Sequence, residues 1–146
     1  MLDSSLGVLM DILEAANRVR TATGRGPAFD VRVVGVEAAR VTTARGFTLA
    51  TRGILRLQPV EAPSIVVLPG EDETQPDALM ASVRSGKRRS LQRFLQGCAG
   101  SRSLLTANCS GVFHLAEAGL LDGKPATTAW FLATRFRQEF PRVELQ

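Results

Sequence analysis

The sequence predicts an α/β protein with an open, mostly parallel sheet that is covered by helices on both faces. Two continuous apolar runs, at 64–68 and 103–107, have the length and composition of strands buried inside a parallel sheet. Segments with apolar residues at helical spacing precede, separate and follow these two runs. Strands that alternate with helices in this way are typical of the α/β class.

The first half of the chain is predicted to supply one helix, one strand and a hairpin. The helix covers 4–22, where leucines recur at helical spacing behind small polar residues that can cap its start. The strand covers 29–36, where valines alternate with Asp30 and Arg32. The hairpin turns around 44–46, in the sequence Ala-Arg-Gly.

The second half is predicted to alternate helices with strands. A helix over 78–99 carries an apolar stripe, and a second helix covers 110–118, where Gly119 can adopt the left-handed conformation that ends a helix. A last helix ends before Pro141, and 142–145 begins a further strand. The stripe of the helix over 78–99 consists of Leu91, Phe94, Leu95 and Cys98.

Composition and charge exclude several classes of protein. The 146 residues make one ordinary domain, and 45% hydrophobic with 22% charged residues indicate a folded core. No apolar run approaches the ~20 residues that a membrane helix needs, and the start lacks the basic region of a signal peptide, so we expect a cytoplasmic protein with no membrane partner. The absence of Tyr argues against a base-stacking surface despite the net charge of +4. Two cysteines are too few for a disulfide framework, and we expect neither a metal nor a cofactor.

A sharp turn between a strand and a helix is predicted at Cys109. The apolar run 103–107 leads directly into the sequence NCSG at 108–111, and a helix-patterned segment follows at once. Such a turn raises the cysteine side chain above the carboxyl edge of the sheet. The N-terminus of the following helix favours a thiolate there. The backbone N–H of Ser110, with that of Gly70 or Glu71, could stabilise an oxyanion beside it.

The sequence around this turn resembles a known family. The segment "CSGVFHLAEAGLLDGKPATTAW" (109–130), with "FRQEFPRVEL" (136–145) after it, resembles the DJ-1/PfpI family of class I glutamine amidotransferase-like proteins. More narrowly, it is similar to the amidotransferase-like N-terminal domain of AraC-type transcriptional regulators. The segments "DILEAANRV" (11–19) and "SIVVLPG" (64–70) match the first helix and the middle strand of that domain.

The resemblance implies a flavodoxin-like three-layer sandwich that forms a homodimer. It implies the ligand-sensing domain of an AraC-type regulator, which responds to a small-molecule effector of unknown identity. Residues 1–146 would form one such domain without its opening strand and its C-terminal part. DNA would be bound only through a C-terminal pair of helix-turn-helix motifs, which lie outside this sequence, so we expect a fragment or a shortened relative.

The resemblance also indicates that Cys109 has lost its catalytic base. Relatives carry a histidine in the sequence ATTHW, and this position is Ala129 here. The single histidine, His114, follows Cys109 by five residues and so lies about 140° around the helix axis from it. We expect His114 to pack at a helix–sheet or subunit contact. Ser5 stands near the place where relatives carry an acid.

The sequence therefore favours a sensor with a degenerate catalytic Cys109 over an enzyme. A thiol without a base is a poor catalyst, because general-base assistance contributes ~10²–10⁴ in rate. One alternative is a DJ-1/PfpI-type cysteine enzyme, such as a glyoxalase, a deglycase or an amide or isonitrile hydrolase. Another is a redox sensor that acts through oxidation of Cys109. In a third alternative, Cys109 has only a structural role, as a small residue packed at a strained turn.

We expect the effector to bind where the loop after 64–68, the Cys109 turn and the segment around 128–130 converge. Glu71 could instead be a solvated acid in the loop, which is the interpretation we prefer. Trp130 could instead be a core residue. The polar residues beside Cys109 could instead stabilise the turn. The basic cluster between 84 and 93 is interpreted as the solvated face of a helix. The expected ligand-binding residues are Gly70, Glu71, Asn108, Cys109, Ser110, Thr128 and Trp130.

Overall fold

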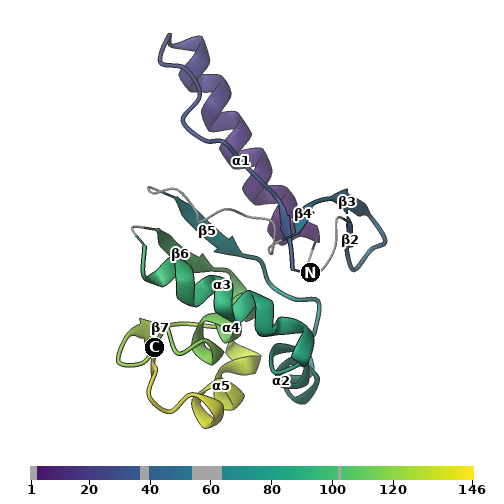
Figure 1. The fold of residues 1–146 in the computed structure, drawn as a ribbon, viewed down its shortest axis with the longest axis vertical. Coiled ribbons are helices and arrows are strands. Elements are labelled where there is room, and N and C mark those ends of the chain that lie inside the picture. The colour runs from purple at the N-terminus through teal and green to yellow at the C-terminus, as the bar shows by residue number, and fades with distance from the viewer. Residues whose placement is uncertain (1–2, 37–39, 54–63, 102) are drawn as a thin grey trace.

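The computed structural model describes residues 3–36, 40–53, 64–101 and 103–146, and it has a mixed α/β fold (Figure 1). Within these residues there are five α-helices and eight short strands. The strands form four separate pairs, three of them parallel and one antiparallel. None of the helices in the described ranges is long and apolar enough to cross a membrane.

The first half of the chain follows the prediction in its helix and its hairpin. Helix α1 covers Asp3–Ala22. Strands β2 (Arg40–Thr42) and β3 (Thr48–Ala50) form the antiparallel hairpin. Gly46 in its turn has a φ of +87°, which glycine adopts without strain.

The strand predicted over 29–36 is mostly absent. Only β1 (Val34–Gly35) is a strand, and it pairs in parallel with β4 (Arg52–Gly53). The residues just before it bond to α1 instead of to a sheet. The Asn17 side chain accepts hydrogen bonds from the N–H groups of Ala28 and Phe29 and donates one to the Phe29 carbonyl.

The two apolar runs form neighbouring parallel strands, as predicted. Strand β5 covers Ile65–Leu68 and β6 covers Leu104–Ala107. Their first residues are paired in register and are both exposed, so the expected burial on both faces fails at this end. The other end lies deeper in the protein, where Leu68 is buried.

The helix predicted over 78–99 is divided in two. Helix α2 (Pro76–Val83) and helix α3 (Arg89–Ala99) are separated by a short 3-10 helix, η2 (Gly86–Arg88). The extended backbone of Ser85, with φ −60° and ψ 147°, interrupts the helical path. The predicted stripe lies on α3, and all of it except the half-buried Phe94 is fully buried.

The C-terminal part packs closely against β6. A 3-10 turn, η3 (Cys109–Gly111), leads into α4 (Val112–Glu117), and Gly119 follows it with the predicted left-handed φ of +73°. A second 3-10 turn, η4 (Trp130–Leu132), leads into α5. The remaining elements are β7 (Pro125–Ala126), α5 (Ala133–Glu139) and β8 (Glu144–Leu145), with β7 and β8 paired in parallel.

The core consists of two clusters that share α4. Phe113 belongs to the first cluster, which joins α2, α4 and α5, and Leu115 to the second, which joins β5, α3 and α4. Helix α1 contributes to neither cluster and projects away from the other helices (Figure 1). The Cys109 turn therefore stands at the start of the helix around which both clusters form.

Candidate ligand site at the Cys109 turn

The chain turns sharply at Cys109. Asn108 is still extended, with φ −105° and ψ 139°, and Cys109 has a φ of +50°. In the described part of the chain, Cys109 is the one non-glycine residue with a positive φ. Holding a non-glycine residue in this conformation costs roughly 1–3 kcal/mol, so the surrounding contacts must enforce it.

Gly111 is one of the contacts that enforce the turn. A Cβ on this residue would lie 2.7 Å from the carbonyl oxygen of Leu68 and 2.9 Å from that of Pro69. Both oxygens belong to the backbone at the end of β5, which cannot move aside as a flexible side chain would. Only glycine therefore allows the turn to pack this closely against β5.

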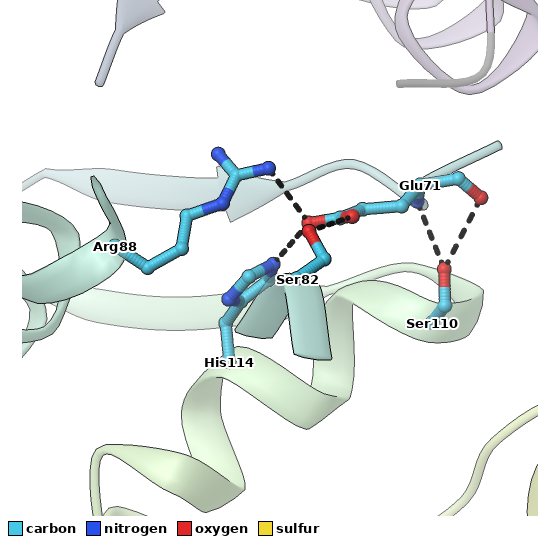
Figure 2. A network of polar contacts seen from close by, with 5 residues as sticks. All are labelled: Glu71, Ser82, Arg88, Ser110 and His114. Atoms are coloured by element: carbon cyan, nitrogen blue, oxygen red, sulfur yellow. Dashed lines mark hydrogen bonds and ion pairs between the residues drawn. The ribbon is translucent and has the colours of Figure 1, made fainter. Parts of the chain in front are cut away.

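Ser110 locks the turn to the loop after β5 (Figure 2). Its hydroxyl accepts a hydrogen bond from the Glu71 N–H at 2.8 Å and lies 3.4 Å from the Glu71 carbonyl oxygen, to which it can donate. The residue is fully buried. Ser110 thus stabilises the turn, as its alternative interpretation expected.

Of the backbone groups predicted as oxyanion donors, the two in the loop after β5 are already engaged. The Glu71 N–H binds the Ser110 hydroxyl, and the Gly70 N–H donates to the Ser5 hydroxyl at 3.4 Å. Neither is therefore available to stabilise an oxyanion at Cys109. Ser5 thus supports the loop after β5.

Glu71 lies at the centre of a polar network, and its interpretation as a solvated loop acid is wrong. Its Oε1 lies 2.6 Å from Nε2 of His114 and accepts a hydrogen bond from Arg88 at 3.0 Å (Figure 2). Its Oε2 accepts a hydrogen bond from Ser82 at 2.9 Å. The Glu71 side chain is only 15% exposed. The network joins the loop after β5 to α2, η2 and α4.

The network holds Glu71 in its ionised form. Burial of the carboxyl group opposes ionisation, but the hydrogen bond from His114, the charges of Arg88 and His114 and the hydrogen bond from Ser82 outweigh it. Together they lower the pKa of Glu71 from 4.5 to about 2. Since an ionised carboxylate only accepts hydrogen bonds, the proton between the two groups resides on Nε2 of His114.

His114 is packed inside the protein, as predicted, and it does not serve Cys109. The residue is 4% exposed, and within the described residues its Nδ1 atom has no hydrogen-bond partner. Its Nε2 atom is occupied by Glu71. The position expected from the resemblance to hold a histidine is Ala129, which packs against the first core cluster. Cys109 therefore has no imidazole base among the described residues.

Three of the predicted ligand-binding residues, Asn108, Cys109 and Thr128, lie together at the turn, and a fourth, Trp130, follows Thr128 by two positions. Asn108 and Cys109 are exposed, and the Thr128 hydroxyl donates a hydrogen bond of 3.5 Å to the Cys109 carbonyl. Trp130 is 87% exposed, and its ring packs edge-to-face against Phe131. The interpretation of Trp130 as a core residue is therefore wrong. Gly70 and Ser110 are buried, and Glu71 faces the polar network.

The basic cluster between 84 and 93 is only partly a solvated face. Arg84 forms ion pairs with Glu117 at 3.1 Å and with Glu139 at 2.8 Å, and Arg88 binds Glu71. Both arginines are thus used within the protein, which the sequence pattern did not predict. Lys87, Arg89 and Arg93 remain exposed.

Two surface hollows lie away from the turn. One of about 320 Å³ is lined by Arg84, Glu117 and Glu139 among others, and its charged groups already pair with one another. The other, of about 500 Å³, lies between α1 and Pro27. Neither is lined by a residue of the Cys109 turn. Within the described ranges, no group of three or more His, Cys, Asp or Glu side chains is placed to hold a metal ion.

The fold is similar to that of two solved regulator structures. No protein-family model matches the sequence, and no curated protein matches it. An AraC family transcriptional regulator from Pseudomonas putida is similar with a TM-score of 0.75 and 21% identity, over 98% of this chain and 69% of that one. A protein from Vibrio parahaemolyticus that has been proposed to be a transcriptional regulator is similar with a TM-score of 0.71 and 20% identity, over the same shares of the two chains. At this identity, the similarity shows a shared fold, and function must be argued from the site.

Proposed function

We propose that this chain is the ligand-sensing domain of an AraC-type transcription regulator, with a flavodoxin-like three-layer fold of the DJ-1/PfpI type and a degenerate amidotransferase-like site. The main support is that Cys109 is exposed and has a left-handed backbone conformation, while the single histidine of the sequence is hydrogen-bonded to Glu71. A thiol without a base suits binding better than turnover. The fold similarity to an AraC family regulator supports the regulatory role.

The effector would bind on the exposed side of the turn. Asn108 and Thr128 offer an amide and a hydroxyl for hydrogen bonds, and the exposed indole of Trp130 offers a flat apolar face. This combination suits a small molecule with one apolar face and one polar edge. The buried contacts of Gly111 and Ser110 would hold the turn rigid beneath it.

Binding could be transmitted through the loop after β5. The loop touches the turn at Ser110, and its Gly70 N–H bonds to Ser5 in the first turn of α1. A shift of the turn on effector binding would therefore reach α1 through this loop. The effector can cause such a shift only if it binds the shifted and the unshifted conformation with different affinities. DNA would be bound by a separate helix-turn-helix domain, in the cytoplasm.

A binding screen with variants of the turn tests the proposal. Small metabolites are screened by thermal shift on the unmodified chain, and each hit is measured by calorimetry on Trp130→Ala, on Cys109→Ala and on Phe47→Ala, a control on the distant hairpin. We expect Trp130→Ala to weaken binding about tenfold or more, which is the effect of losing an aromatic contact, and Cys109→Ala and Phe47→Ala to bind normally.

The same variants separate the proposed sensor from an enzyme. Turnover of methylglyoxal or of a small amide that disappears in Cys109→Ala would contradict the proposal and favour a DJ-1/PfpI-type cysteine enzyme. Equal binding by Trp130→Ala and the unmodified chain would place the effector elsewhere.

The exposure of Cys109 favours one second candidate, a redox sensor. Cys109 is exposed, whereas Cys98 is buried and its burial raises the pKa of its thiol. Oxidation by peroxide should therefore be confined to Cys109. Mass spectrometry after peroxide treatment tests this candidate, with Cys98 in the same chain as the internal control.

A further inference from the structure

The positive charge of the chain is concentrated in one segment. Six of the 18 basic residues and none of the 14 acidic residues lie between positions 78 and 116. This segment therefore carries a formal charge of +6, and the rest of the chain carries −2, which together make the net charge of +4. Charges that are separated in this way produce a local positive field at the surface that presents them.

Of the five basic residues that the structure describes in this segment, two are used inside the protein. Arg84 pairs with Glu117 and Glu139, and Arg88 pairs with Glu71. The other three are exposed, and they have no ion-pair partner among the described residues. We call them the outer basic face, which consists of Lys87, Arg89 and Arg93.

The outer basic face lies on the solvent side of α3. Helix α3 packs against the β5–β6 pair (Figure 1), with Leu91 and Leu95 buried in the second core cluster. At about 100° per residue, Arg89 and Arg93 lie on the opposite side of the helix from these two leucines. Lys87 lies in η2, directly before α3. The three cations therefore share one surface.

Neither η2 nor α3 contains an acid that could offset these charges. The two elements have no Asp or Glu, and the first turn of α3 is free of acids as well. The backbone N–H groups at the start of a helix carry a positive partial charge, which favours acids there and disfavours cations. Lys87 and Arg89 stand at this end of α3, so their charges repel one another and the helix dipole. An external anion would remove this repulsion.

The composition and spacing of the outer basic face suit phosphate groups. An arginine can bind a phosphate with two parallel hydrogen bonds, and a lysine adds a point charge. Arg89 and Arg93 are four residues apart, which corresponds to about 6 Å along a helix. Two phosphate steps along one strand of a DNA duplex cover about 7 Å of its axis. The two arginines can therefore reach phosphates of the same strand.

The surroundings of the face argue against a single strand and against a membrane. Phe94 is the one aromatic residue of α3, and it packs beside the second core cluster, so no ring is offered for stacking on unpaired bases. None of the large apolar side chains of η2 and α3 is exposed, whereas a helix that lies in a membrane surface inserts such side chains.

We propose that the outer basic face binds the phosphate backbone of double-stranded DNA without reading its sequence. This contact would add to that of the separate DNA-binding domain. The choice of DNA among phosphate-bearing partners rests on the proposed function, because a DNA-binding domain would hold the sensing domain near the duplex. Effector binding at the Cys109 turn is measured separately, so a failure of one proposal is not mistaken for a failure of the other.

Fluorescence anisotropy of a short labelled DNA duplex, titrated with the chain at several salt concentrations, tests the proposal. We expect the logarithm of the association constant to fall with the logarithm of the salt concentration with a slope of about −2 to −3, which is the value for three phosphate contacts. The triple variant Lys87→Gln, Arg89→Gln and Arg93→Gln should lose tenfold or more in affinity at low salt, together with most of this slope.

A matched control separates the face from the net charge. It replaces three exposed arginines that lie after α1, on β2 and on α5, so both triple variants have the same net charge. None of the three has an ion-pair partner within the described ranges. The control should retain most of the affinity and the slope of the unmodified chain. Its substitutions are Arg25→Gln, Arg40→Gln and Arg137→Gln.

Single variants keep the test decisive if a triple variant does not fold. Arg89→Gln and Arg93→Gln should each reduce the steepness of the slope by about 0.9, because each removes one phosphate contact. No binding of the duplex by the unmodified chain at low salt, or an equal loss in the two triple variants, would overturn the proposal. Tighter binding to the single strand or to phosphatidylserine vesicles than to the duplex would also overturn it.

Discussion

Gly111 occupies a position that no other residue can take without moving the backbone. The space for its missing side chain is filled by two carbonyl oxygens at the end of β5. This close approach is what presses the Cys109 turn against the neighbouring strand. The left-handed φ of Cys109 is thus maintained by a contact between segments about forty residues apart in the sequence.

A substitution at Gly111 should therefore be costly. We expect Gly111→Ala to lower the free energy of unfolding by about 1–3 kcal/mol or more, because the new Cβ overlaps the Leu68 carbonyl. Gly97→Ala is the matched control, since nothing lies within 4 Å of its added Cβ. In the last turn of α3 it should stabilise the protein by up to about 0.5–1 kcal/mol. Urea unfolding of both variants measures the difference, and equal stabilities would contradict the close contact.

Glu71 is the titratable residue whose environment changes its chemistry most clearly. Its lowered pKa means that the ionised form is stabilised in the folded chain. The stabilisation is complete above pH 4.5, the ordinary value, and it is lost as the pH falls towards 2.

The substitution Glu71→Gln should reproduce this loss near neutral pH. A shift from 4.5 to about 2 corresponds to at most about 3 kcal/mol of stability. We expect Glu71→Gln to be destabilised by roughly this amount at neutral pH, and the difference from the unmodified chain to shrink as the pH falls below 4.5. Asp72→Asn, at the exposed neighbouring position, is the control. A pH-independent difference would show that Glu71 acts through its shape and not through its charge.

Ion pairs at the end of α2 connect three helices. Arg84 follows the last residue of α2 and binds Glu117 of α4 and Glu139 of α5. Arg135 of α5 also binds Glu139, and it reaches Asp77 at the start of α2. These pairs lie at the surface, so they orient the helices while the apolar clusters supply most of the stability.

Removing the Arg84 charge should thus have a small and salt-dependent effect. We expect Arg84→Met to lower the free energy of unfolding by no more than ~1 kcal/mol at low salt, and by less at high salt, because exposed ion pairs are screened. Arg93→Met on the exposed face of α3 is the control and should show no such salt dependence. Thermal unfolding at two salt concentrations makes the measurement. A large loss of stability in Arg84→Met that is the same at both salt concentrations would mean that Arg84 acts by packing and not by charge.

On the scale of the whole molecule, the buried apolar residues are concentrated in one part of the chain. The buried apolar clusters lie between residues 68 and 143, around the aromatic contacts of Phe113 with Phe136 and Phe140. Helix α1 lies outside these clusters and keeps an exposed apolar stripe. The C-terminal region thus carries the apolar core of the described residues, and helix α1 contributes little to it.

Local patterns in the sequence were sufficient to predict the Cys109 turn, the two parallel strands beside it, the hairpin and α1. Each of these depends on residues that are close together in the chain, through apolar spacing, turn residues or a glycine at a helix end. The strand over 29–36 and the unbroken helix over 78–99 were wrong, because side-chain contacts with α1 and the extended Ser85 overrode the local pattern.

The partners of the site residues were decided by the tertiary structure. Glu71 meets Arg88 and His114, which are 17 and 43 positions away, and no local pattern encodes which side chains a loop acid will reach. The same holds for Ser110, whose hydroxyl is used by the Glu71 backbone. The sequence by itself determined where the turn is and that its base is missing from the expected position. Only the folded chain determined which groups remain accessible there, because accessibility depends on packing between distant segments.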